Sequence, residues 1–406
     1  MAEFVQANLE QMLTELEQLQ RIQLLSNEEV KLVIKKRKKF EYKMQKRQKQ
    51  KNDILEYIKY ESSLLNLIAI RRDQSQYMNK KNEIDYAIAK RINKLFRILE
   101  HRFAGDLMVW SSHMAFLKEM KWTEQIGKIY RRMLQVHPEK VDLWISAGRY
   151  ELGNDASNKN VNNIENARTI FMEGLRFHPR SIELLLESFR LELVFIQRLK
   201  NDPEHYIVPD ENKDAIMNGK VAEAICRRSV ETYQTSTDST SSDEDAVNLL
   251  LAMLNSAKLL GAGHNLQTSI VKMMIEKFPK EPLTWMGYAS VSLHPPVKTD
   301  SEEVDQDECI SHVERSASNK VQEFCSRFEQ GLVKELPVEV PVKRQQLLDI
   351  YLKSLLYILD QNKDLKICEI LAKRVWCVLA YGKQHALMNE RNSNVFQMLM
   401  EYNDEQ

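Results

Sequence analysis

A helical repeat with a period of 34 residues, read from Trp110 to Trp144, is the feature that most constrains the fold of this chain. In each unit a run of apolar residues with helical spacing ends at a proline position, and a large apolar residue follows six positions later. Proline ends a helix because its ring removes a backbone donor and disfavours helical backbone at the preceding residue. The pairs are Ala104 and Trp110, Pro138 and Trp144, Pro179 and Leu185, and Pro279 and Trp285, with Ala104 in the proline position.

Two amphipathic helices per period are typical of arrays in which one helix pair cannot bury its apolar stripe without a neighbouring pair. The chain has only 11 glycines and 10 prolines among its 406 residues, which favours continuous helix. We therefore predict an all-α fold, an α-solenoid of helix pairs preceded by an N-terminal helical extension.

The first helix of each unit places further residues three and six positions after its leading residue, on the same helix face. Trp144, Ala147 and Tyr150 form one such set, and an acid, Glu151, follows at the seventh position. This pattern resembles the HAT (half-a-TPR) repeat, whereas the Gly and Ala spacing of a TPR array is absent. We expect a structural role for the residues that carry the repeat, which are Trp110, Pro138, Trp144, Tyr150, Pro179, Pro279 and Trp285.

The N-terminal helix pattern carries one narrow apolar seam, with steps of four and three residues. The seam consists of Val5, Leu9, Met12, Leu16 and Leu19. Two alternatives follow: the seam binds a partner helix, or it packs on the first repeat of the chain itself. Ser26, with Glu29 three residues later, predicts a capping box at the start of a second helix.

The second helix pattern is the most basic part of the chain. Eleven of the 21 residues from Lys31 to Lys51 are Lys or Arg, and Glu41 is the single acid among them. The central run is a candidate nuclear-import signal or a surface for RNA phosphates, and a solvated helix face is the structural alternative. The run consists of Lys35, Lys36, Arg37, Lys38 and Lys39.

The amino-acid sequence of the N-terminal region shows a closer resemblance to one group of HAT-repeat proteins. Its first six residues, the segment Phe40-Glu-Tyr-Lys43 and the opening of the repeats at 53–61 resemble the HAT-repeat subunits of the small-subunit processome. The likeness is close to about Leu193 and weaker beyond it, apart from the block around Pro279. It implies a nucleolar protein of the UTP-B subcomplex that supports pre-rRNA processing toward 18S rRNA. The implied partners are other processome subunits, including β-propeller proteins, and U3 small nucleolar RNA and pre-rRNA, bound directly or indirectly.

Composition divides the chain into five segments. We expect amphipathic and basic helices at 1–50, HAT repeats at 51–200, further helical repeats at 201–292, a disordered insertion at 293–319 and C-terminal helices at 320–406. The acidic Ser/Thr-rich tract at 232–245 is expected to be a loop, because such a composition cannot build a core. Ser241 and Ser242 each have an acid three residues on, as acid-directed phosphorylation requires, and Ser242 is also a candidate helix cap.

Patterns that indicate catalysis or metal binding are absent from the sequence. It has no Gly-rich phosphate-binding motif, no C-x-x-C spacing among its five cysteines and no pairing at four-residue spacing among its nine histidines. We expect no catalytic residue, metal, cofactor or small-molecule substrate. No apolar run reaches the roughly 18 residues that cross a bilayer, so no membrane contact is expected. Because the formal net charge is zero, any nucleic-acid contact must come from a local patch.

The functional hypothesis that follows is a non-catalytic scaffold in the nucleolus. The alternatives are a HAT-repeat adaptor in an mRNA-processing complex and a TPR-like co-chaperone. A co-chaperone groove needs Lys, Arg and Asn on the inner helix faces, whereas the third and sixth positions of these helices are apolar or aromatic.

Overall fold

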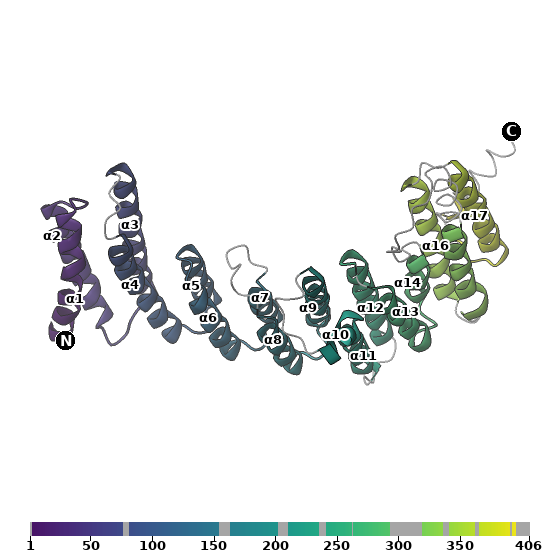
Figure 1. Ribbon diagram of the computed structural model, residues 1–406, viewed down its shortest axis with the longest axis horizontal. Coiled ribbons are helices and arrows are strands. Elements are labelled where there is room, and N and C mark those ends of the chain that lie inside the picture. Colours follow the sequence, from purple (N-terminus) through teal and green to yellow (C-terminus); the bar gives the residue numbers. More distant parts are fainter. Residues whose placement is uncertain are drawn as a thin grey trace. The chain divides into compact units, whose positions relative to one another are not determined.

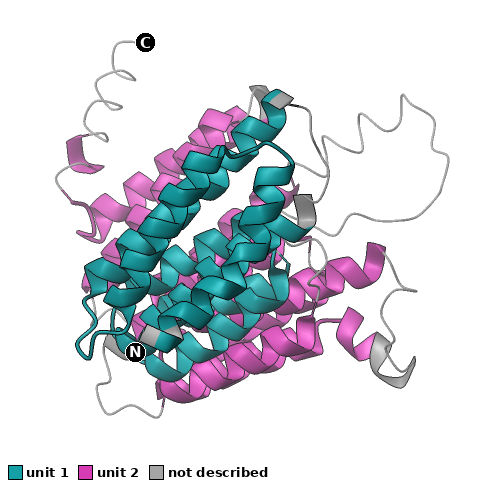
Figure 2. Cartoon of the chain, turned by 90° about the vertical axis from the view of Figure 1, so that its left-hand side faces the viewer, with its two compact units in different colours: residues 1–162 teal, residues 163–406 magenta. Residues whose placement is uncertain are grey.

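The computed structural model describes residues 2–75, 81–153, 163–201, 210–234, 241–261, 263–292, 319–335, 341–361, 365–389 and 392–394. Within these ranges every regular element is helical, as Figure 1 shows, and no strand occurs. The all-α prediction is therefore confirmed. The chain divides into two compact units, residues 1–162 and 163–406, which Figure 2 distinguishes by colour.

The first unit contains seven helices among its described residues. They are α1 Ala2–Arg21, α2 Asn27–Met44, α3 Lys51–Ser75, α4 Lys81–Arg102, α5 Leu107–Glu119, α6 Thr123–Val136 and α7 Val141–Glu151. Each helix from α1 to α6 packs on the next one, and α1 also packs on α4. The predicted N-terminal extension at 1–50 is thus part of this unit.

The beginning of α2 is tied to α3. The backbone N–H of Glu29 donates to Ser26 Oγ at 3.2 Å and the Glu29 carboxylate accepts from the Ser26 N–H at 2.8 Å, which confirms the predicted capping box. Arg71 of α3 donates to both carboxylate oxygens of Glu29, at 2.6 and 2.8 Å. These bonds from Arg71 and from the Ser26 backbone lower the pKa of Glu29 to about 2.

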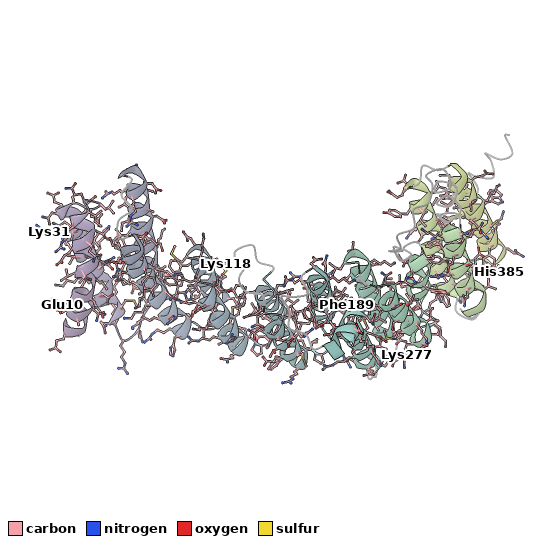
Figure 3. All side chains as sticks on the ribbon, in the orientation of Figure 1. Glu10, Lys31, Lys118, Phe189, Lys277 and His385 are labelled. Atoms are coloured by element: carbon pink, nitrogen blue, oxygen red, sulfur yellow. The ribbon has the colours of Figure 1, made fainter. Side chains whose placement is uncertain are left out.

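The second unit begins with α8. Its helices are α8 Ile164–Phe177, α9 Ile182–Asn201, α10 Asp210–Met217, α11 Lys220–Gln234, α12 Ser241–Leu259, α13 His264–Lys277, α14 Pro282–Ser292, η1 Gly331–Glu335, α16 Pro341–Gln361 and α17 Leu365–Gln384. Residues 319–330 are helical and run directly into the π-helical turn η1. Phe189 of α9, labelled in Figure 3, is fully buried in this unit.

The fixed interval of six residues has a direct structural cause. In each Trp-containing unit the indole N–H donates to the backbone carbonyl at the proline position. The three bonds are Trp110 Nε1 to Ala104 O at 2.8 Å, Trp144 Nε1 to Pro138 O at 3.0 Å and Trp285 Nε1 to Pro279 O at 2.9 Å. Carbonyls just after a helix lack an intrahelical partner, so a buried indole both fills the core and supplies the missing donor.

One apolar core joins the last helices of the second unit to Trp285. The Phe328 ring stacks on that of Tyr351 at 4.6 Å between centroids, and both belong to the buried cluster that contains Trp285. A Cβ at Gly331 would lie 2.5 Å from the Trp285 ring, so only glycine fits where η1 crosses that ring. The predicted C-terminal helices therefore continue the core of the preceding repeat.

The structure bears on three of the predicted segments. The division between the compact units falls after residue 162, inside the segment 51–200 that the sequence assigns to one run of repeats. Both ends of the tract 232–245, which was expected to be a loop, are helical, because α11 extends to Gln234 and α12 begins at Ser241. Ser242 therefore lies inside the first turn of α12. The insertion expected at 293–319 falls outside the described residues up to position 318.

Candidate functional site

The basic run of α2 separates into an exposed set and one buried arginine. Lys35, Lys36, Lys38 and Lys39 are exposed, and Lys31 on the same helix is labelled in Figure 3. Arg37 has no exposed surface, so the prediction that all five residues form one accessible basic patch is wrong for Arg37. Positions 33, 37, 41 and 44 lie on the inner face of α2, which turns Arg37 away from solvent.

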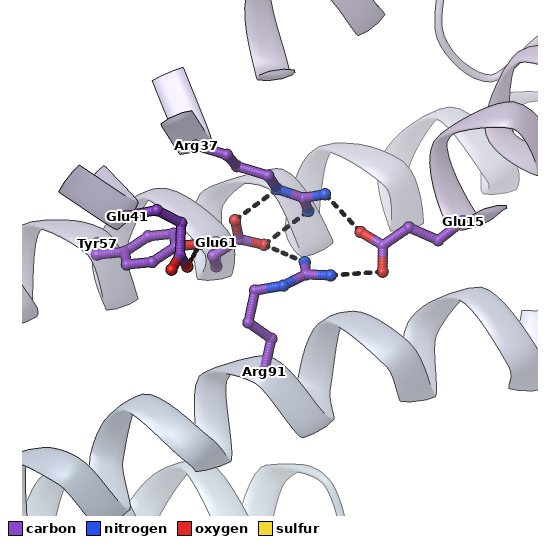
Figure 4. A network of polar contacts seen from close by, with 6 residues as sticks. All are labelled: Glu15, Arg37, Glu41, Tyr57, Glu61 and Arg91. Carbon is purple, nitrogen blue, oxygen red and sulfur yellow. Dashed lines mark hydrogen bonds and ion pairs between the residues drawn. The ribbon is translucent and has the colours of Figure 1, made fainter. Parts of the chain in front are cut away.

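Arg37 belongs to a closed ring of two arginines and two glutamates from four helices (Figure 4). Its Nε and Nη2 donate to the two carboxylate oxygens of Glu61 on α3 at 2.7 and 2.8 Å, and its Nη1 donates to Glu15 on α1 at 2.5 Å. Arg91 on α4 closes the ring through Glu61 at 3.0 Å and Glu15 at 2.7 Å. The ring fixes α1, α2, α3 and α4 to one another.

The charges in this ring balance. Burial alone would lower the pKa of the Arg37 guanidinium, but the attraction of Glu61 and Glu15 outweighs it and raises the net pKa. The pKa of Arg91 is raised in the same way, against the effects of its burial and of Arg37. Because each charge has an opposite partner at hydrogen-bond distance, the ring is a structural device with no free acid or base for chemistry.

The seam of α1 is covered by the chain itself. Val5, Leu16 and Leu19 are at most 1% exposed, and Leu9 and Met12 are at most 9% exposed. The contacts of α1 are with α2 and α4, and Glu15 on the same helix enters the ring. Of the two alternatives from the sequence, the structure shows the seam packed on the chain, so it offers no surface to a partner helix.

Glu61 follows Ile54 by seven residues and Glu192 follows Leu185 by seven, as Glu151 follows Trp144, and these two acids have partners that sequence reasoning missed. Arg37 precedes Glu61 by 24 residues, and Arg168 precedes Glu192 by the same interval in the second unit. Arg168 binds Glu192 through Nε at 2.7 Å and Nη2 at 2.6 Å, which repeats the two-pronged contact of Arg37. In the repeat that contains Glu151, the residue 24 positions earlier is Gly127. A Cβ at Gly127 would lie 3.3 Å from the Glu151 carboxylate. The spacing of 24 residues was the available signal.

A second buried polar chain crosses α4, α5 and α6. His113 Nδ1 lies 2.5 Å from Glu100 Oε1 and its Nε2 lies 2.8 Å from Asn93 Oδ1, while Asn93 Nδ2 donates to Gln125 Oε1 at 2.6 Å. A Glu–His pair orients the base in some hydrolases, but the described contacts of His113 include no hydroxyl or thiol that it could activate. We therefore assign these hydrogen bonds around His113 a role in packing α4, α5 and α6 together.

Among the described residues no cluster of three or more His, Cys, Asp or Glu side chains could hold a metal ion. Burial raises the pKa of the Cys226 thiol, which keeps it in the unreactive protonated form. None of the described helices combines the length and apolar character that crossing a bilayer requires.

Comparison with known proteins identifies relatives with one common description. A family model described as U3 small nucleolar RNA-associated protein 6 matches residues 9–91, a range that contains all four members of the ring. The human U3 small nucleolar RNA-associated protein 6 homolog is 32% identical over 345 residues, which are 84% of this chain and 54% of that protein.

Two further relatives carry the same description. The mouse homolog is 30% identical over 345 residues, again 84% of this chain and 54% of that protein. The protein of Schizosaccharomyces pombe is 33% identical over 199 residues, 49% of this chain and 40% of that protein. The chain thus spans about half the length of the human and mouse relatives.

Proposed function

We propose that this chain, which belongs to the family of U3 small nucleolar RNA-associated protein 6, is a non-catalytic scaffold of the nucleolar small-subunit processome. In this role it supports pre-rRNA processing toward 18S rRNA. The observation that carries the proposal is the similarity to proteins named for association with U3 small nucleolar RNA, which extends over 84% of the chain. The partners we propose are other processome subunits, including β-propeller proteins, together with U3 RNA and pre-rRNA.

The chemistry of the described residues supports a scaffold. The polar clusters of the first unit hold helices together: the ring joins α1 to α4, and the His113 chain joins α4 to α6. Arg–Glu pairs and Trp–carbonyl hydrogen bonds recur in several repeats and likewise hold neighbouring helices and turns in place. A rigid helical frame of this kind presents exposed helix faces to other subunits.

The proposal predicts which RNA accompanies the chain in cells. A tagged form of the chain should enrich U3 small nucleolar RNA well above a spliceosomal RNA after affinity purification, with an untagged strain as the control. Sequencing of the bound RNA and mass spectrometry of the bound proteins are the measurements. Enrichment of spliceosomal RNA instead of U3 RNA would favour the mRNA-processing adaptor and contradict the proposal.

The exposed lysines of α2 give a second prediction, concerning location. Replacing Lys35, Lys36, Lys38 and Lys39 with glutamine is expected to lower the nucleolar fraction of the protein, because an exposed lysine run of this kind can serve as a nuclear-import signal. Imaging of a tagged variant measures the fraction. The variant should keep the melting temperature of the parent, since all four side chains are exposed.

A matched control removes the same number of charges elsewhere. Lys220, Lys272, Lys277 and Lys280 are exposed on the second unit, and their replacement with glutamine should leave the nucleolar fraction unchanged. An equal loss in both variants would show that total charge matters and that the α2 face has no special role.

A further inference from the structure

A basic groove lies on the first unit, apart from the lysine run of α2. It consists of two adjoining hollows that share Arg97 and Gln125 and are lined mainly by α4, with further residues from α1, α2 and α6. Lys35, Lys36, Lys38 and Lys39 are not among its lining residues. All of its lining residues belong to the first compact unit.

The charge of the groove is strongly positive. Seven of its lining residues are Lys or Arg and three are acids. The acids are buried and hydrogen-bonded: Glu15 lies in the ring, Glu41 accepts from Tyr57, and Glu100 contacts His113. The cations that remain exposed therefore face solvent without a matching acid in the groove.

The exposed cations share one face of α4 with an aromatic side chain. Tyr86, Lys90, Lys94 and Arg97 follow one another at intervals of four, four and three residues, which places them in one row. All four are exposed, and Tyr86 is 55% exposed. Lys128 on α6 is exposed across the groove from this row.

Two aromatic rings lie within this charged surface. The ring centroids of Tyr86 and Trp122 are 5.6 Å apart and the rings are inclined by 56°. Trp122 is half-buried and lines the same hollow as Lys90 and Lys94. A solvent-accessible aromatic pair beside a row of cations is the combination on which single-stranded nucleic acids stack their bases and place their phosphates.

We propose that this groove binds single-stranded RNA. Bases stack on Tyr86 and Trp122, and the phosphates contact Lys90, Lys94, Arg97 and Lys128. The choice of RNA over DNA rests on the proposed function. The choice over an acidic peptide rests on the exposed rings, because a run of carboxylates gains nothing from an aromatic face, whereas every base has one.

The test uses the whole chain and a fluorescent oligouridylate of 12 nucleotides, with binding measured by anisotropy at several salt concentrations. Tyr86→Ala is expected to weaken binding about 10-fold, as loss of one stacking platform does. Lys90→Gln combined with Lys94→Gln should lower the slope of log affinity against log salt by about 1.4, because each single-strand phosphate contact contributes about 0.7.

A matched control removes two lysines of α2. Lys35→Gln combined with Lys38→Gln should change affinity less than about threefold, because these residues lie outside the groove. If this pair reduces the salt slope as much as the groove pair does, RNA binds on α2 and the proposal falls. If Tyr86→Ala has no effect and polyglutamate competes with the RNA, the groove is a site for acidic peptides and the proposal also falls.

This experiment is independent of the cellular one. Loss of oligouridylate binding with continued recovery of U3 RNA from cells would overturn the groove but leave the scaffold function intact, with RNA held through other subunits. Binding that depends on Tyr86 without recovery of U3 RNA would uphold the groove and remove the proposed function. Circular dichroism should show the parent's melting curve for every groove variant, since the changed side chains are exposed.

Discussion

Replacing Arg37 with methionine is expected to lower the free energy of unfolding of the first unit by about 3–5 kcal/mol, the usual effect of removing one partner from a buried ion pair. The ring contains five hydrogen bonds from arginine to glutamate, and Arg37 donates three of them. Without Arg37, Glu15 and Glu61 keep only the two bonds from Arg91. Glu61 is fully buried and Glu15 is 5% exposed, so water cannot replace what is lost.

Two comparison variants show whether the loss of stability comes from the unpaired buried charges or from placing a methionine in α2. Lys38→Met makes a similar change at an exposed position of the same helix and should alter stability by less than about 0.5 kcal/mol. Exchanging all four ring residues for leucine and methionine removes every charge of the ring and should recover most of the stability lost in Arg37→Met.

Hydrogen exchange suits this measurement, because a chain with two compact units does not unfold in a single step. Protection should fall in peptides from α1, α2, α3 and α4 and stay unchanged in peptides from α8 onward. If protection is lost equally in Arg37→Met and Lys38→Met, or in neither, the ring contributes little to the unit.

Local rules made much of the fold predictable from the sequence. The capping box at Ser26 and Glu29 involves only four consecutive residues. The hydrogen bond from the Trp144 indole to Pro138 O joins residues only six positions apart. Patterns of this kind depend little on the rest of the molecule. The presence of the helices could therefore be predicted from the sequence. The division after residue 162 could not be predicted, because it depends on which helices pack together.

The ring and the groove were not predicted because they combine residues that are distant in sequence. Glu15 and Arg91 are 76 residues apart, and only the packing of α1 on α4 brings them within 2.7 Å. The density of lysines around Arg37 drew attention to α2, although one member of that run points inward. On α4 the row from Tyr86 to Arg97 has lower charge density, and only folding places it beside Trp122 and Lys128, so the sequence alone did not single it out.

Replacing Trp144 with alanine is expected to destabilise the first unit by about 3–5 kcal/mol, which is the typical cost of a large-to-small change in a core. Trp144 is 3% exposed and its indole donates to Pro138 O, so the change opens a cavity and removes the donor that fixes the turn between α6 and α7. Hydrogen exchange in peptides from the first unit measures the loss. Met108→Ala, at a residue that is 70% exposed, is the apolar control and should cost less than about 0.5 kcal/mol.

Trp144→Phe divides the loss between its two causes. Phenylalanine keeps most of the apolar volume but cannot donate, so this variant should lose about 1 kcal/mol, the usual contribution of one hydrogen bond. Because repeats are stabilised mainly by their neighbours, the effect of Trp144→Ala should extend to α5 and α6, and hydrogen exchange should show faster opening there. Faster exchange confined to α7 would mean that the helix pairs are stable one by one, and the repeat would then be a pattern of sequence without cooperative coupling.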